Sequence, residues 1–199
     1  MSYVIFDVGR VLIEWDPRRL YRQLLPDEAA VDHFLTRICP PEWNLEQDRG
    51  RPWAEAVAVQ SARHPDHADL IAAWDRRWSE TVPDAIWETA ALFGRLRARG
   101  VPVYGLTNFS QEKWPLVVDR FSFLSDFDDV VVSGEVGLVK PDPAIYRLLL
   151  ARNGLRPEQG LFIDDSAANI GAAAGLGLGT HHFQGAAELA RDLTARGLI

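Results

Sequence analysis

The chain contains little cysteine, little lysine and no long hydrophobic run. Cys39 is its only cysteine, which excludes an intrachain disulfide and a cysteine-based zinc cluster. No apolar stretch reaches the ~18 residues that a membrane-spanning helix needs. The first residues enter a strand-like run directly, without a basic or apolar leader pattern. We therefore expect no membrane partner and a cytoplasmic protein.

An excess of basic residues is also absent. The net charge is −7, which argues against nucleic acid or an anionic membrane as a partner. An anionic small molecule stays compatible, because a local cation or a bound metal can reverse the sign inside a pocket. Of the 21 basic residues, only Lys113 and Lys140 are lysine. In so arginine-rich a chain, a lysine at either position is expected to have a specific role. The sequence leaves monomer and homodimer equally open.

Short apolar runs alternate with helical patterns along most of the chain, which is typical of a parallel α/β sheet covered on both faces. The expected strands are 3–6, 101–106, 129–133, 160–163 and 179–183, and the expected helices around them are 86–99, 141–153, 167–176 and 186–196.

Residues 15–85 break this alternation. They hold five of the seven tryptophans, show no convincing strand, and have helical patterns near 17–25, 27–38, 51–63 and 66–80. Pro40-Pro41 and the segment 48–52 are typical of loops. The predicted fold is thus α/β, with a Rossmann-like parallel sheet core formed by 1–14 and 86–199 and an inserted all-helical cap over 15–85.

Polar residues follow the predicted strands, where the carboxyl ends of parallel strands converge on one crevice. Asp7, the pair Thr107 and Asn108, and the pair Asp164 and Asp165 directly follow three strands, and Lys140 follows a fourth after a short loop. Three carboxylates in one crevice repel one another unless a cation offsets their charge. An all-oxygen set of ligands suits Mg²⁺.

Each of these residues also has a purely structural explanation. Asp7 fits a turn or a helix N-cap, and Thr107 with Asn108 fits a helix cap. Capping explains only one carboxylate of the pair Asp164 and Asp165. Lys140 fits a solvated loop charge, although a compact ammonium stands out in so arginine-rich a chain. The coincidence of all of them at one edge favours a functional site.

These residues carry a resemblance to the haloacid dehalogenase-like hydrolase superfamily that extends over essentially the whole chain. Its four ordered motifs read FDVGRVL at 6–12, LTN at 106–108, GLVKP at 137–141 and FIDDSAAN at 162–169. The helical insertion resembles the small cap of that superfamily. Gly9, the Asp164-Asp165 pair and the Asp48-Arg49-Gly50 segment are most similar to bacterial sugar-1-phosphate phosphatases.

The resemblance implies a Mg²⁺-dependent phosphatase that acts on a small phosphorylated metabolite, for example a sugar phosphate. Asp7 would be the nucleophile and form an aspartyl-phosphate, with Lys140 and Thr107 as further catalytic residues. Asp7, the carbonyl of Gly9, Asp165 and Asp164 would hold the metal. The residues that would bind substrate are Thr107, Asn108, Lys140, Arg10 and Arg49. Asn169 would orient the metal shell.

One departure from the family pattern matters. Most phosphatases of this superfamily carry a second Asp two residues after the nucleophile as general acid and base, and here that position is Gly9. The loss of such a group typically costs about 10²–10⁴-fold in rate. The next residue, usually Gly, is Arg10, either a substrate clamp or a surface charge. A leaving group that needs little protonation, a proton donor from the cap, or a different or lost activity would each account for Gly9.

Two other functions are compatible with the same fold. A 2-haloacid dehalogenase shares the nucleophile and the lysine, but it uses no metal, so the pair Asp164 and Asp165 argues against it. The tyrosine that such enzymes usually carry at position 9 is also absent. A catalytically weakened binding or regulatory protein is favoured by Gly9 and disfavoured by the otherwise intact catalytic positions.

Overall fold

A five-stranded, all-parallel sheet forms the centre of the protein. The computed structural model describes residues 1–199, and the strands are β1 (Tyr3–Phe6), β2 (Val103–Thr107), β3 (Asp129–Val132), β4 (Gly160–Asp164) and β5 (Gly179–His182). Their order is β3-β2-β1-β4-β5. Because β1 pairs with both β2 and β4, the residue after β1 lies at the middle of the carboxyl edge. The predicted α/β fold with a parallel sheet is confirmed.

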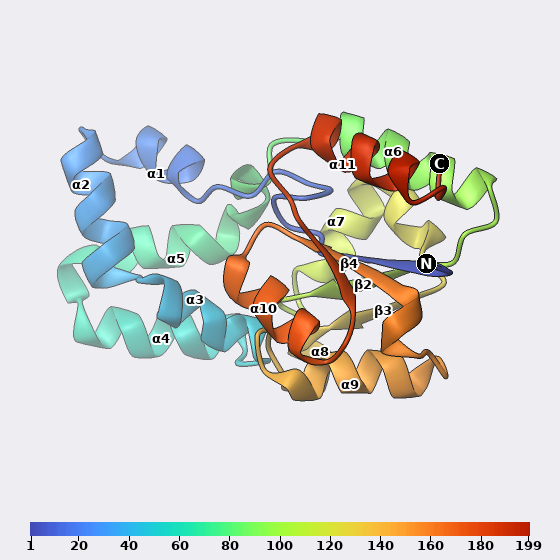
Figure 1. Cartoon of the computed structure of the whole chain (residues 1–199). Coiled ribbons are helices and arrows are strands. Elements are labelled where there is room, and N and C mark those ends of the chain that lie inside the picture. Colours follow the sequence, from blue (N-terminus) through green and yellow to red (C-terminus); the bar gives the residue numbers. More distant parts are fainter.

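Helices cover both faces of this sheet (Figure 1). They are α6 (Trp87–Ala98), α7 (Trp114–Arg120), α8 (Ser133–Val136), α9 (Pro143–Arg152), α10 (Ala167–Gly175) and α11 (Ala186–Ala195). In β1, Val4 and Phe6 belong to one buried cluster, which includes residues of α6 and α11. Tyr3 and Ile5 belong to a second cluster, which includes residues of α9 and α10. The alternation along β1 thus supplies both faces of the sheet with core residues.

The chain between β1 and α6 is helical and lies beside the sheet (Figure 1). Its helices are α1 (Arg18–Leu24), α2 (Glu28–His33), a π-type turn η1 (Phe34–Ile38), α3 (Pro41–Asp48), α4 (Trp53–Arg63) and α5 (Ala68–Arg76). Trp43, Trp53 and Trp74 pack together in its core with ring centroids 5.4–6.5 Å apart. None of the helices has the length and apolar character that crossing a bilayer requires. We call residues 15–85 the cap segment, and its independence as a domain stays a prediction.

The chain enters and leaves the cap segment through two paired stretches. Ile13 and Ala85 form an antiparallel bridge. The Glu14 N–H donates to the Asp84 carbonyl at 2.9 Å, and the Ile86 N–H donates to the Leu12 carbonyl at 2.9 Å. These bonds fix the cap segment beside the carboxyl end of β1.

The structure differs from the sequence prediction at Pro40-Pro41, where we expected a loop. Pro41 instead begins α3, because the fixed φ of proline suits the first helical position and its missing N–H costs nothing there. The helix α3 ends at Asp48. Asp48 is therefore a helical residue and not part of the predicted loop.

Candidate active site

Three carboxylates meet at the carboxyl edge of β1 and β4. Phe6 is in register with Ile163, and the Asp7 N–H donates to the Ile163 carbonyl at 2.9 Å. This register brings Asp7 beside Asp164 and Asp165, and one carboxylate oxygen from each of the three lies within 4.8 Å of the others. The group meets the geometric requirement for holding a metal ion.

The ammonium of Lys140 lies between two of these carboxylates. Its Nζ is 2.9 Å from Asp7 Oδ1 and 2.7 Å from Asp164 Oδ2, and its side chain is 1% exposed. Burial acts to lower the pKa of Lys140, but the two carboxylates outweigh it, so the pKa is raised and the ammonium stays charged.

Asp164 uses all of its acceptor capacity within the protein. Its Oδ1 accepts the Ser166 N–H at 2.8 Å, its Oδ2 accepts Lys140 Nζ, and both oxygens accept Asn169 Nδ2 at 3.0 Å. Asp164 is fully buried. Its contacts therefore suit the role of positioning Lys140 more than the role of a direct metal ligand.

Asp7 has one engaged and one free oxygen. Oδ1 accepts the Val8 N–H at 2.7 Å and pairs with Lys140, whereas Oδ2 makes no hydrogen bond in the protein. Burial raises the pKa of Asp7, and the ammonium of Lys140 opposes that shift. A partly desolvated carboxylate oxygen thus faces the site without a protein partner.

Two further oxygens beside Asp7 lack protein partners. The carbonyl of Gly9 accepts no hydrogen bond, and the half-buried carboxylate of Asp165 receives none from another side chain. Burial, and then the charge of Asp164, raise the pKa of Asp165. Free oxygens on Asp7, Gly9 and Asp165 form an all-oxygen donor set, which fits the preference of Mg²⁺.

The residues that follow β2 lie on the other side of Lys140. The Asn108 side chain donates to the Lys140 carbonyl at 3.0 Å and accepts the Lys140 N–H at 2.8 Å. The side chain of Asn108 therefore fixes the lysine loop, and its backbone N–H, which has no acceptor in the protein, is left for an anion. Thr107 ends β2 beside it and is 1% exposed.

A cavity of about 230 Å³ opens above these groups. The sheet side of its wall includes Asp7, Gly9, Asn108, Lys140 and Asp165, and the cap segment supplies Trp15, Asn44, Asp48 and Trp78. The cap segment thus closes over the cluster formed at the strand ends.

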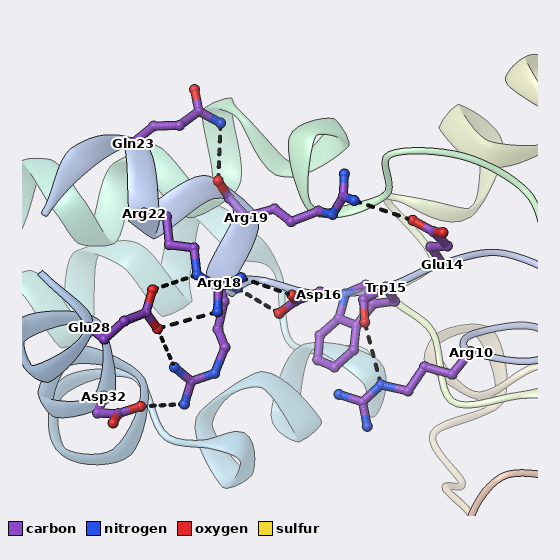
Figure 2. Close-up of polar contacts among 10 residues, drawn as sticks. All are labelled: Arg10, Glu14, Trp15, Asp16, Arg18, Arg19, Arg22, Gln23, Glu28 and Asp32. Carbon is purple, nitrogen blue, oxygen red and sulfur yellow. Dashed lines mark hydrogen bonds and ion pairs between the residues drawn. The ribbon is translucent and has the colours of Figure 1, made fainter.

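Arg10 lies at the rim of the cavity in an unusual backbone conformation. Its φ is +61°, in the left-handed region that side chains with a Cβ adopt at a cost of about 1–2 kcal/mol. This explains physically why glycine is the usual residue at this position of the motif. The Arg10 guanidinium lies 5.1 Å from the centroid of the Trp15 ring, and its Nε donates to the Trp15 carbonyl at 3.4 Å (Figure 2).

Arg49 does not reach the cavity. It is exposed, and its guanidinium pairs with Glu46 at 2.8 Å. The cavity is instead lined by its neighbour Asp48 and by Asn44 and Ser110. The sequence marked Asp48 through the Asp-Arg-Gly segment, whereas no sequence signal pointed to Asn44 or Ser110.

A comparison with known families agrees with this geometry. Residues 2–177 match the model of the haloacid dehalogenase-like hydrolases. The chain belongs to this family. The resemblance inferred from the four motifs is thereby confirmed at the level of the superfamily.

Individual relatives of this family member include both phosphatases and larger proteins. It is similar to drimenol cyclase drtB of Aspergillus calidoustus, at 33% identity over 96% of this chain and 35% of the relative. It therefore spans about a third of that protein. It is also similar to phosphoserine phosphatase of Thermus thermophilus, at 25% identity over 83% of this chain and 81% of the relative.

The fold is similar to that of a solved HAD family enzyme from Bacteroides thetaiotaomicron. The TM-score is 0.71 at 23% identity, over 93% of this chain and 95% of that one, and that enzyme was crystallised with magnesium and inorganic phosphate. At this identity the likeness supports the fold alone.

Proposed function

We propose that this hydrolase is a Mg²⁺-dependent phosphatase that uses Asp7 as its nucleophile. The single observation that carries the proposal is that carboxylate oxygens of Asp7, Asp164 and Asp165 lie within 4.8 Å of one another, with the buried ammonium of Lys140 paired to Asp7. Mg²⁺ held by Asp7, Gly9 and Asp165 would offset the negative charge of a phosphate dianion.

In the proposed reaction, the carboxylate oxygen of Asp7 that does not hold the metal forms a bond to phosphorus while the bond from phosphorus to the leaving-group oxygen breaks. Water then attacks the aspartyl-phosphate, which releases inorganic phosphate and restores Asp7. Lys140 and the Asn108 N–H would bind phosphoryl oxygens, with Thr107 beside them. Arg10 would contact the part of the substrate nearest the rim, because its guanidinium lies there against Trp15.

Known relatives support a phosphatase but do not select the substrate. Phosphoserine phosphatase and phosphoglycolate phosphatase act on different compounds, as their names state. A sugar phosphate stays our prediction for the substrate class, and a small phosphorylated metabolite is the coarser proposal.

Gly9 favours a second candidate, a catalytically weakened binding or regulatory protein on the same fold. An added Cβ at Gly9 would meet no atom within 4 Å, so no crowding accounts for the missing acid. The two candidates differ in whether the purified chain turns over any phosphate ester.

The test is hydrolysis of aryl phosphates, sugar phosphates, phosphoserine and phosphoglycolate, with Mg²⁺ or with EDTA, beside one 2-haloacid. We expect phosphate release only with Mg²⁺ and no halide release. Asp7→Asn should lower kcat by at least about 10³-fold, with the far-ultraviolet circular dichroism spectrum unchanged. Unchanged turnover by Asp7→Asn would show that another group is the nucleophile, and absent turnover by the wild type would favour the binding protein.

A further inference from the structure

Hydrolysis of an ordinary phosphate ester needs a proton donor that the sequence does not supply beside Asp7. When the bond from phosphorus to an alcohol oxygen breaks, an alkoxide leaves unless an acid protonates that oxygen. Gly9 has no side chain to do this, and the open space around it shows that no neighbouring side chain occupies its place.

The other ionisable groups of the cavity are committed elsewhere. Lys140 is held between Asp7 and Asp164, and Asp165 belongs to the proposed metal site. The guanidinium of Arg10 lies against the Trp15 ring at the rim. Asp48 is the one carboxyl group of the cavity wall outside the metal cluster.

The backbone around Asp48 is anchored to the sheet side of the cavity. Ser133 Oγ donates to the Asp48 carbonyl. Two residues later the backbone passes so close to Gly134 that a Cβ on Gly50 would lie 2.9 Å from the Gly134 carbonyl oxygen. Asp48 comes from the cap segment, and these contacts hold its backbone against the start of α8, directly after β3.

The carboxyl group of Asp48 is oriented but not neutralised. Asn44 Nδ2 donates to Oδ2 at 3.0 Å, the Ser110 backbone N–H acts to lower the pKa of the carboxyl group, and no cationic side chain pairs with it. Burial raises the pKa of Asp48 to about 7, and the charge of Asp7 adds to the shift. The other charged groups that line the cavity are Arg10, Lys140 and Asp165.

We propose that Asp48 is the catalytic proton donor of this phosphatase and takes the role that a carboxyl group at position 9 would have. The proposal rests on the proposed function, since it concerns the leaving group of the same reaction. Asp48 gives its proton to the ester oxygen as the bond to phosphorus breaks, so the products are a neutral alcohol and the Asp48 carboxylate. That carboxylate then takes a proton from the water that attacks the aspartyl-phosphate, which restores the acid.

The test compares leaving groups in Asp48→Asn. For an alkyl phosphate, which needs protonation, we expect kcat/KM to fall about 10²–10⁴-fold. For 2,4-dinitrophenyl phosphate, whose leaving group needs none, we expect a loss below about tenfold. Glu46→Gln is the matched control, because the Glu46 side chain is on the same helix and is 46% exposed, and it should match the wild type on both esters.

Two further readouts separate proton donation from a structural role. In the wild type, kcat/KM for the alkyl phosphate should decline as the pH rises above about 7, and this decline should be absent in Asp48→Asn. In the metal-free protein, the ¹³C carboxyl resonance that Asp48→Asn removes should titrate near pH 7. Gly9→Asp combined with Asp48→Asn should restore part of the lost activity on the alkyl phosphate.

The outcomes distinguish this proposal from the proposed function. An active wild type with equal losses on both esters in Asp48→Asn, or an unchanged pH profile, would overturn the role of Asp48 and leave the phosphatase intact. A wild type that hydrolyses no phosphate ester with Mg²⁺ would overturn both.

Discussion

Replacement of Lys140 by methionine tests the electrostatic centre of the site. Met is similar in length to Lys, so the substitution removes the charge with little change of volume. In the wild type the ammonium lies 2.9 Å and 2.7 Å from carboxylates whose side chains are 11% and 0% exposed. Removal of one partner of a buried ion pair typically costs about 3–5 kcal/mol, because it leaves buried charge without compensation.

For a chain of this size, that loss corresponds to a decrease in Tm of roughly 6–20 °C. The sign of the pH dependence follows from the two remaining carboxylates. Without the ammonium, the pKa of the buried carboxylates is higher in the folded variant than in the unfolded chain. The free energy of unfolding of the variant therefore falls as the pH rises. The deficit relative to the wild type should therefore be larger at pH 7.5 than at pH 5.

Urea denaturation in EDTA at both pH values measures this deficit. Arg49→Met is the control, because the side chains of Arg49 and its partner Glu46 are both 46% exposed and such a pair contributes about 1 kcal/mol or less. Asp164→Asn combined with Lys140→Met should recover part of the loss. A deficit for Lys140→Met below about 1 kcal/mol, or one that is equal at both pH values, would refute the electrostatic reasoning.

Two more substitutions test other features of the site. In the folded protein the pKa of Asp48 is raised from 3.8 to about 7, so the free energy of unfolding of the wild type falls as the pH rises through that range. Asp48→Asn has no such group, so its free energy of unfolding should increase relative to that of the wild type by about 2–4 kcal/mol between pH 4 and pH 8. Denaturation curves with no such trend would contradict the burial of this group. Because Arg10 has a φ of +61°, Arg10→Gly should be about 1 kcal/mol more stable than Arg10→Ala; equal melting temperatures would show that the backbone relaxes.

The strands and their terminal residues were predictable because topology alone determines them. All four residues of β1 are buried, and a short apolar run of this kind is typical of a strand covered on both faces. Once the strands are parallel, the residues after β1 and β4 meet at one edge. Asp7, Asp164 and Asp165 therefore lie together, as their positions after the predicted strands indicate.

The cap residues were less predictable because they depend on helix phase. Successive helical residues are rotated by about 100°, so one residue of α3 faces the cavity while the next faces solvent. Asp48 lines the cavity, whereas Arg49 pairs with Glu46 on the outside. The double proline at the start of α3 concealed the helix, and with it the phase that separates these two residues.

The six residues from 108 to 113 contact both the Lys140 loop on the sheet side of the site and Trp53 in the cap segment. Asn108 fixes the backbone of Lys140, and two positions later Ser110 Oγ accepts the indole N–H of Trp53 at 3.0 Å. Glu112 also accepts the backbone N–H of Trp53 at 3.1 Å. A displacement of this loop when an anion binds would alter the polarity around a buried indole, so the emission spectrum of Trp53 provides an intrinsic optical signal of ligand binding.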